Sequence, residues 1–383
     1  MRMRPSRALA VALAGALVLA ACADAPDEEV VDEEPEEEVD EEPEEEVDED
    51  EEAVEEDEPE DEPAEETDFL ACQITDTGGV DDRSFNQTVW EGFQQAEEEL
   101  GVEIAVLESE SEADFDPNIR AFIDRGCDLI VTVGFLLGDA TAEAAEANPD
   151  QLFAIVDFAF EDETYDNVRE IVFETDEAGF LAGYVAAGTT ESGIIGTYGG
   201  INIPTVSIFM DGYLAGAEYY NEEHGTDVAV EGWDGDDGLF TGDFESQDEG
   251  RRVTDSLLEQ GADVIMPVAG PVGLGTATAL EDFGEGLMIW VDTDGYVSAP
   301  EFGDLMLTSV LKRMDVASFT VIEEVINDEF EGGLFLGDLE NEGVGIAPFH
   351  DHEDTVPDEV KDAIDDLRQG IIDGEISVDP ADY

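Results

Sequence analysis

The chain has 383 residues, of which 104 are acidic and only 13 are Lys or Arg, giving a formal net charge of −91. A surface this negative repels phosphates, which excludes nucleic acid as a partner and disfavours polyanionic substrates. The acidity extends along the whole sequence. We interpret it as adaptation to high salt, where screening limits repulsion to a few ångströms.

Residues 1–21 have the pattern of a secretory signal peptide. Three arginines precede an apolar run from Ala8 to Ala21, which is too short to span a bilayer comfortably. The run ends in small residues before Cys22 and resembles a bacterial lipobox, which predicts lipidation of Cys22 and attachment to the outer face of the cell membrane. The alternative is an ordinary signal peptide followed by a chance cysteine.

Residues 22–68 continue as a segment made almost entirely of Glu, Asp, Pro, Val and Ala. The octet VDEEPEEE occurs in tandem at 31–38 and 39–46. This composition cannot form a packed core, and charge repulsion keeps it extended. We therefore predict a disordered, solvated stalk, with weak calcium capture as the alternative.

From residue 69 onward, continuous apolar runs alternate with helical stretches, which predicts parallel strands buried on both faces by helices. The expected strands are 69–75, 101–109, 127–134, 152–157, 171–173, 193–200, 227–233, 262–270 and 287–292. Each unit has the length of a right-handed βαβ crossover.

The folded part is too large for one core, so we predict two doubly wound parallel-sheet lobes joined by a hinge. Lobe 1 is expected at about 69–187 with part of the C-terminal tail, and lobe 2 at about 188–300. The tail supplies a strand at 305–309 and helices at 314–327 and 356–372. Cys72 and Cys127 each begin a strand-like run; we interpret them as buried thiols, with a disulfide as the alternative.

Ligands of such sheets bind beyond the carboxyl ends of the strands, and two facing lobes bring these ends to one cleft. The residues that follow the strands are aromatic rings, carboxylates, an amide and a lysine, which suit a neutral heterocycle carrying a sugar. Each aspartate alone could equally be a helix cap. The candidate ligand-binding residues are Asp76, Phe85, Asn86, Asp157, Phe209, Phe244, Gly270, Asp292 and Lys312.

Several blocks are distinctive in order and spacing: DTGGVDDRSFNQTVWEGFQQA, GTYGGINIPTVSIFMDGYLAGA, QGADVIMPVAGPVGLG, IWVDTDG and LTSVLKRMDVAS. Together they resemble the basic membrane protein family of substrate-binding lipoproteins, which includes purine nucleoside receptors. The resemblance covers about 70–320. It implies the type I periplasmic binding protein fold and delivery of a nucleoside, expected to be a purine nucleoside, to an ABC transporter permease.

The same resemblance implies roles for individual residues. Phe85 and Asn86 would meet the base, Asp157 would bond its edge, and Phe244 would stack on its other face. Phe209 would line the second lobe. The remaining implied contacts are Asp76 in the first loop, and Asp292 and Lys312 at the ribose hydroxyls and the cleft floor.

The sequence departs from the family pattern at three places. Arg83 stands where a lysine is common, and Gly295 ends a segment where glutamine is common. The acidic stretch around Phe244 makes its alignment ambiguous, and Phe240 is the alternative.

Alternatives to transport are a ligand-sensing receptor and a nucleoside hydrolase. A hydrolase needs a tighter aspartate cluster than residues 76–82 offer, and the glycines of 270–275 lack the order of a dinucleotide fingerprint. His350 and His352 could bind a metal only weakly. We therefore expect a binding protein without enzymatic activity, cofactor or metal.

Overall fold

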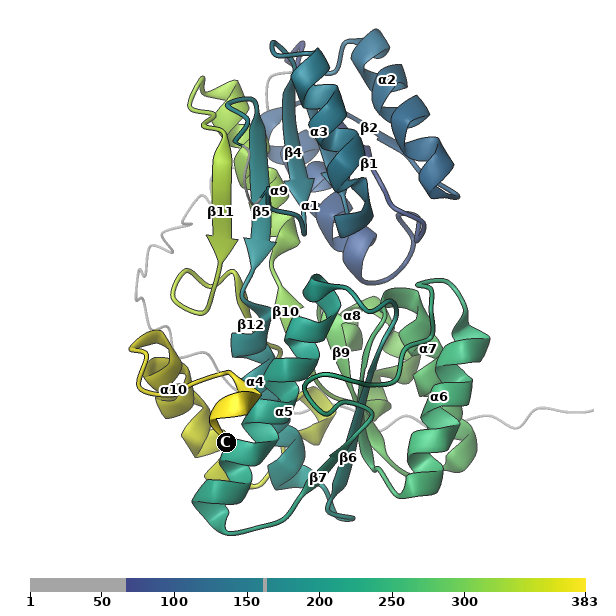
Figure 1. Cartoon of the computed structure of the whole chain (residues 1–383), viewed down its shortest axis with the longest axis vertical. Coiled ribbons are helices and arrows are strands. Elements are labelled where there is room, and N and C mark those ends of the chain that lie inside the picture. The colour runs from purple at the N-terminus through teal and green to yellow at the C-terminus, as the bar shows by residue number, and fades with distance from the viewer. Residues whose placement is uncertain (1–66, 161–163) are drawn as a thin grey trace, which may run out of the picture. The chain divides into compact units, whose positions relative to one another are not determined.

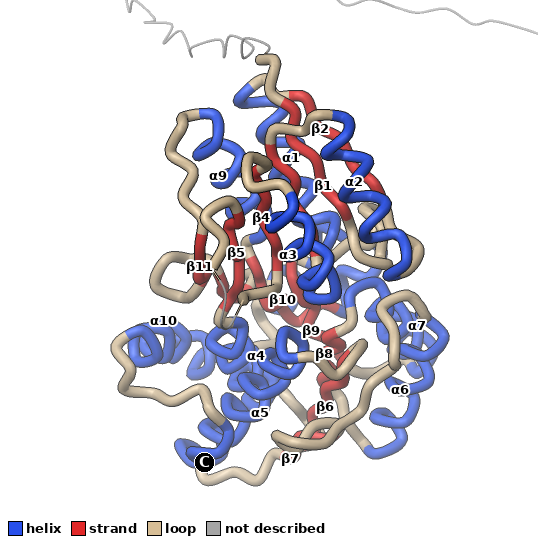
Figure 2. Tube along the Cα trace, turned by 45° about the horizontal axis from the view of Figure 1, so that its top comes forward, coloured by secondary structure: helices blue, strands red, loops and turns tan. Residues whose placement is uncertain are grey.

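The computed structural model describes residues 67–160 and 164–383. The predicted signal peptide, Cys22 and nearly all of the predicted stalk lie outside these residues. The described part contains two six-stranded sheets, each covered by helices on both faces (Figures 1 and 2).

The first sheet is entirely parallel, in the order β2-β1-β3-β4-β5-β11. Its strands are β1 (Leu70–Ile74), β2 (Glu103–Leu107), β3 (Leu129–Val133), β4 (Leu152–Val156), β5 (Val168–Phe173) and β11 (Gly333–Gly337). One face is covered by α1 (Phe85–Leu100) and α9 (Met314–Ile326), the other by α2 (Phe115–Arg125) and α3 (Gly138–Ala147). We call this sheet and its helices the first lobe.

The second sheet has the corresponding order β7-β6-β8-β9-β10-β12, with β12 antiparallel to β10. Its strands are β6 (Ile194–Gly199), β7 (Ala229–Glu231), β8 (Val264–Val268), β9 (Leu287–Asp292), β10 (Met306–Lys312) and β12 (Val344–Ile346). Its main helices are α4 (Thr175–Thr189), α5 (Pro204–His224), α6 (Gln247–Gln260), α7 (Gly273–Phe283) and α10 (Asp358–Ile372), with the short α8 (Gly295–Ser298) after β9. We call this the second lobe.

Continuous apolar strands bury both of their faces, as the sequence predicted. Every residue of β3 is buried, with Leu129 and Val131 facing the core under α1 and Ile130 facing the core under α2. At about 25 cal/mol per Å² of apolar surface removed from water, such double burial is the main stabilising contribution of a parallel sheet.

Helix α4 belongs to the second lobe, which corrects the expected lobe boundary near residue 187. Its glycines allow close packing on α5: a Cβ at Gly183 would lie 2.1 Å from the Tyr213 carbonyl oxygen, and one at Gly216 of α5 would lie 2.0 Å from the Phe180 oxygen. Only glycine fits where two helix backbones approach this closely. The chain therefore leaves the first lobe at Glu174, before α4 begins.

In the described residues the chain crosses between the lobes at three places. The crossings are Glu174 after β5, Arg313 after β10, and residues 338–343 between β11 and β12. The Glu174 amide donates to the Gly337 carbonyl and the Arg313 amide to the Gly343 carbonyl, both at 2.9 Å. The crossings are thus bonded to one another, as the strands of a hinge are.

The C-terminal tail is divided between the lobes. It supplies α9 and β11 to the first lobe and β12 and α10 to the second. Neither β11 nor β12 was predicted, because both lie in glycine-rich segments without a long continuous apolar run.

The two lobes repeat one another in the sequence around their third and fourth strands. The starts of β3 and β8 are 135 residues apart, and so are the starts of β4 and β9. The strand sequences LFAIVD and LMIWVD end in Asp157 and Asp292, which have the same spacing. Both aspartates have left-handed backbones, with φ of 66° and 73°.

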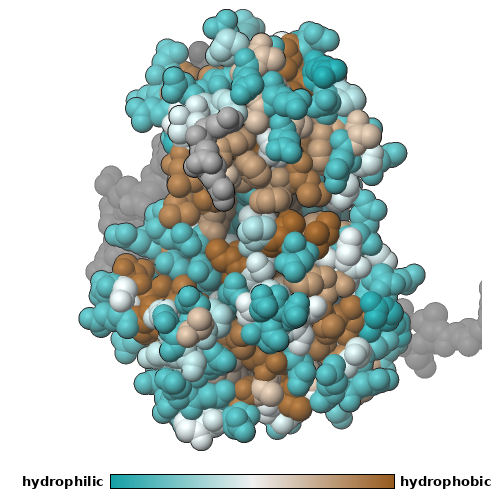
Figure 3. Space-filling view, in the orientation of Figure 1, coloured by the Kyte–Doolittle hydropathy of each residue, from teal (hydrophilic) through white to brown (hydrophobic). Residues whose placement is uncertain are grey.

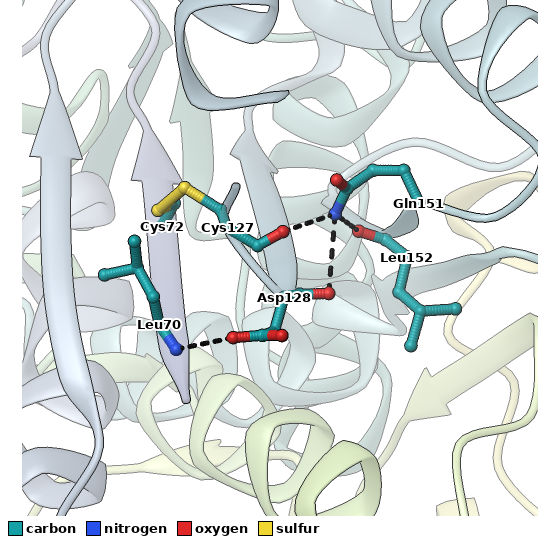
Figure 4. Close-up of a disulfide and its surroundings, with 6 residues drawn as sticks. All are labelled: Leu70, Cys72, Cys127, Asp128, Gln151 and Leu152. Carbon is teal, nitrogen blue, oxygen red and sulfur yellow. Dashed lines mark hydrogen bonds between the residues drawn. A yellow bond between two sulfur atoms is a disulfide. The ribbon is translucent and has the colours of Figure 1, made fainter. Parts of the chain in front are cut away.

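Cys72 and Cys127 form a disulfide, so the interpretation as buried thiols was wrong (Figure 4). Their Cα atoms are 6.1 Å apart because β1 and β3 are neighbours in the sheet. Next to the bridge, the Asp128 carboxylate accepts from the Leu70 amide at 2.8 Å, and the Gln151 side chain donates to the Cys127 carbonyl at 3.0 Å. Two positions in a sequence carry no information on this proximity.

Removal of the disulfide tests its contribution to stability. The double variant C72A/C127A is expected to lose roughly 2–5 kcal/mol of unfolding free energy, because the unfolded chain gains freedom over the segment between the cysteines. Urea denaturation in molar salt measures this. A reducing agent should destabilise the unchanged protein and leave the variant unaffected; equal unfolding midpoints for the two proteins would contradict the expectation.

Candidate functional site

A cleft of about 620 Å³, counting its opening to solvent, lies where the carboxyl ends of strands from both sheets meet. This volume is typical of small-molecule sites, and the strand order places the loops after β1, β3, β6 and β8 at topological switch points. The structure brings all nine predicted residues to its wall: Asp76, Phe85, Asn86, Asp157, Phe209, Phe244, Gly270, Asp292 and Lys312. On the face in Figure 3, apolar side chains gather toward the middle and hydrophilic ones cover the top and sides.

Four phenylalanines supply the flat surfaces of the cleft. Phe85 begins α1, Phe135 follows β3, and Phe209 lies on α5. The fourth, Phe244, lies in the loop before α6 (Gln247–Gln260). Rings from both lobes therefore face the same space, which is the arrangement needed to hold a planar ligand.

Of the two candidate phenylalanines in the loop before α6, Phe244 is the one that lines the cleft. Its ring lies against Gly200, where an added Cβ would come within 2.3 Å. The alternative residue, Phe240, instead packs edge-on against Trp233 with ring centroids 6.0 Å apart and does not line the cleft.

Asn86 is held by two carboxylates in the loop between β1 and α1. Its amide nitrogen donates to Asp76 at 2.8 Å and to Asp82 at 3.1 Å. This orients its Oδ1, which is buried and has no partner among the described residues, as a free acceptor. Asn86 can therefore accept a hydrogen bond from a ligand.

Asp82 was not predicted as a lining residue, and its role is to cap α1. Its carboxylate accepts from the backbone amides of Ser84, Asn86 and Gln87 at 2.8–3.0 Å. An aspartate two residues before a predicted helix start is the signal that could have identified it. The cap fixes both Phe85 and Asn86 at the first turn.

Asp157 and Asp292 occupy corresponding positions in the two lobes and are each bonded across the cleft. Asp157, after β4, accepts from the Lys312 ammonium of β10 at 2.5 Å. Asp292, at the end of β9, accepts from the Ser84 hydroxyl of the first lobe at 2.6 Å. Each aspartate therefore receives a bond from the opposite lobe.

Lys312 is 2% exposed and is surrounded by aromatic rings. Its Nζ lies 5.0 Å from the centre of the Phe85 ring, 5.5 Å from that of Phe173 and 5.6 Å from that of Phe209. The ion pair with Asp157 and the ring faces together offset the cost of burying the ammonium.

Burial raises the pKa of the cleft carboxyls. The pKa of Asp76, of Asp82 and of Asp292 rises to about 6, mainly because burial disfavours the charged form, and hydrogen bonds to each group oppose this. Burial also raises the pKa of Asp157, against the attraction of Lys312. The cleft thus gathers several carboxyls around one paired cation, which disfavours anionic ligands.

The apolar part of the wall was not among the predicted ligand-binding residues, because apolar side chains in strands, helices and loops carry no sequence signal that separates a cleft wall from the core. It consists of Leu136, Ile203, Val206, Val268, Ala269, Pro271 and Val291. His350 is not placed for metal binding: its ring stacks on Tyr296 and hydrogen-bonds Asp294 at 2.7 Å. Residues 67–160 and 164–383 contain no cluster of three metal-ligating side chains.

The profile of the Bmp family, described as ABC transporter substrate-binding protein PnrA-like, matches residues 69–382. The chain belongs to this family. An ABC transporter nucleoside-binding protein of Lactococcus lactis is 31% identical over 330 residues, covering 82% of this chain and 89% of that protein. An uncharacterized lipoprotein of Pyrococcus furiosus is 34% identical over 281 residues, covering 71% and 68%.

This Bmp-family chain also shares its fold with solved solute-binding proteins. The crystal structure of one from the ABC transporter system of Aeropyrum pernix K1 matches with a TM-score of 0.74 and 28% identity, over 81% of this chain and 92% of that one. The fold is the type I periplasmic binding protein fold, and the chain is a substrate-binding protein of an ABC transporter. Among the described residues, no helix has the length and apolar character to cross a membrane.

The contribution of the buried ion pair to stability can be measured by substituting Lys312, with the same substitution at Lys361 as the comparison. Lys312→Met is expected to cost about 3–5 kcal/mol of unfolding free energy, because it leaves the Asp157 carboxylate buried and unpaired. The double variant with Asp157→Asn should recover part of this loss. Lys361→Met is the control, because the Lys361 ammonium contacts surface groups, namely the Glu353 and Asp358 carboxylates and the Glu353 carbonyl. Its unfolding midpoint should equal that of the unchanged protein. Equal denaturation curves for the two single variants would contradict this assignment.

Proposed function

We propose that this substrate-binding protein captures a nucleoside, preferably a purine nucleoside, outside the cell and delivers it to the permease of an ABC importer. The observation that carries the proposal is the composition of the cleft wall. Phenylalanines from both lobes face one space together with carboxylates and an amide oxygen that accept hydrogen bonds.

A nucleoside matches this wall in chemistry. Its planar base can lie between Phe85 and Phe244, and its ribose hydroxyls and ring N–H groups can donate to the acceptors of Asn86, Asp157 and Asp292. A nucleotide does not match, because Lys312, the only cation among the described residues that line the cleft, is already paired with Asp157. The name of the Lactococcus lactis relative supports the same ligand class.

We further propose that Cys22 carries lipid and that the acidic segment to residue 68 tethers the binding domain to the outer face of the membrane. The lipobox-like residues before Cys22 support this, and so does the description of the Pyrococcus furiosus relative as a lipoprotein. Several acyl chains, each contributing about 0.8 kcal/mol per buried CH2, would hold the protein at the bilayer.

The ligand class is tested by calorimetry of guanosine, inosine, adenosine, uridine, ribose and inosine monophosphate in molar salt. Purine nucleosides are expected to bind most tightly, and the monophosphate poorly. Phe85→Ala and Phe244→Ala should each weaken nucleoside binding by roughly 1–3 kcal/mol through loss of stacking.

Phe240→Ala is the matched control, since Phe240 lies in the same loop as Phe244 and packs on Trp233 outside the cleft. It should leave affinity unchanged. Binding of ribose alone with the strength of a nucleoside would contradict the proposal, and turnover of inosine would favour a hydrolase.

The anchor is tested by Cys22→Ser expressed in the producing cell. The unchanged protein should sediment with membranes and be released by detergent, and the variant should not carry acyl chains by mass spectrometry. A variant that keeps the same acyl mass would contradict lipidation at Cys22.

A further inference from the structure

Ser84 stands immediately before α1, where a serine normally caps the helix. Here its hydroxyl makes no capping bond. Asp82 accepts from the free backbone amides of the first turn instead, including those of Asn86 and Gln87. The Ser84 hydroxyl is therefore free for another partner.

That partner belongs to the opposite lobe. Ser84 is fully buried, and its Oγ donates to the Asp292 carboxylate at 2.6 Å and approaches the Val291 carbonyl at 3.2 Å. Short hydrogen bonds to a carboxylate are among the stronger ones in proteins. The bond engages Oδ2 of Asp292, and Oδ1 has no hydrogen-bond partner among the described residues.

Two further contacts hold the same loop against the second lobe. The Trp290 indole N–H donates to the Arg83 carbonyl at 3.3 Å, and the Arg83 guanidinium pairs with Glu301. Arg83 adopts a left-handed backbone with φ of 61°, which is unfavourable for a residue with a side chain. The loop is thus fixed in a conformation that turns Ser84 toward β9.

We propose that Ser84 is a positioning residue, which orients Asp292 toward the ligand and can do so only when the two lobes are closed. Asp292 lines the cleft and one of its oxygens is held by Ser84, so the other is directed to the ligand. Because donor and acceptor lie on different lobes, opening of the hinge breaks the bond. Closure of the two lobes therefore also orients the Asp292 carboxylate toward the ligand.

This inference rests on the proposed function, because it requires a ligand that donates to Asp292. The charged groups that act on Asp292 are Lys312 of β10, Asp157 after β4, and Asp82 and Asp76 of the loop between β1 and α1. Lys312 and the Ser84 hydroxyl favour the charged carboxylate, and burial and the other aspartates oppose it. By favouring the charged form, the hydrogen bond from Ser84 also keeps the Asp292 carboxylate able to accept a hydrogen bond from the ligand.

The experiment is calorimetry of inosine and guanosine binding to the full chain in molar salt between pH 5 and pH 8. In the unchanged protein, affinity is expected to fall as pH drops through about 6, as Asp292 and the neighbouring carboxyls of Asp76 and Asp82 become protonated. Ser84→Ala should weaken binding about tenfold at pH 8, the effect of losing one hydrogen bond to a charged group. It should also move the pH midpoint upward, because the pKa of Asp292 rises when its donor is lost.

Glu301→Gln is the matched control, because it removes the ionic part of a surface contact between the same loop and the second lobe without touching Asp292. It should weaken binding about twofold or less and leave the pH midpoint in place. Melting temperatures in molar salt verify that both variants fold, as expected with the Asp82 cap intact.

The outcomes separate the two proposals. If the unchanged protein binds no nucleoside, the proposed function fails and the role of Ser84 fails with it. If it binds nucleosides and Ser84→Ala keeps the wild-type affinity and pH midpoint, only the role of Ser84 is overturned. A tenfold loss without a shift of the pH midpoint would also overturn it, because loss of closure alone explains that result.

Discussion

The buried ion pair between Lys312 and Asp157 is the interaction on which the binding cleft depends. The chain carries 104 acidic residues and two lysines, yet one of the lysines is almost fully buried in the cleft. Without a cation there, the Asp157 carboxylate would be buried and unpaired, at a cost of several kcal/mol. The pair also joins an aspartate of the first lobe to a strand of the second. One contact therefore offsets part of the negative charge of the cleft and links the two halves that form it.

Close packing makes each lobe rigid, so that the two lobes can move relative to each other only at the segments that cross between them. Glycine positions let α4 and α5 pack backbone against backbone, and the disulfide fixes β1 to the entrance of β3. The three crossings are instead short and bonded to one another through Gly337 and Gly343. Such a distribution lets two packed bodies rotate on a narrow connection, as hinge-closing proteins do. The loop of Arg83 and Ser84 lies away from these crossings in sequence, and its contacts with the second lobe complete the closed arrangement.

Salt screens the exposed carboxylates of this protein much more strongly than the buried carboxyls of the cleft. Exposed carboxylates repel one another only over the screening length, which is about 3 Å in molar salt. Buried carboxyls such as Asp76 and Asp82 are shielded far less, and their pKa rises to about 6 in spite of several hydrogen bonds. High salt therefore makes the acidic exterior tolerable without relieving the cleft, where Lys312, Ser84 and backbone amides must do so. The general acidity says little about the ligand, and the arrangement of a few buried groups says much more.

The sequence by itself determined the two-lobed parallel fold and the set of residues at the cleft, because continuous apolar strands and the residues that follow them are local features. The family resemblance identified Phe85, Asn86 and Lys312 by their motifs. Tertiary structure alone decided which groups are partners. Cys72 and Cys127 are 55 residues apart and Ser84 and Asp292 are 208 apart, and no local pattern records that strand order and lobe closure bring them together. Packing against α5 likewise decided to which lobe α4 belongs, since the residues of α4 are apolar enough to be buried in either lobe.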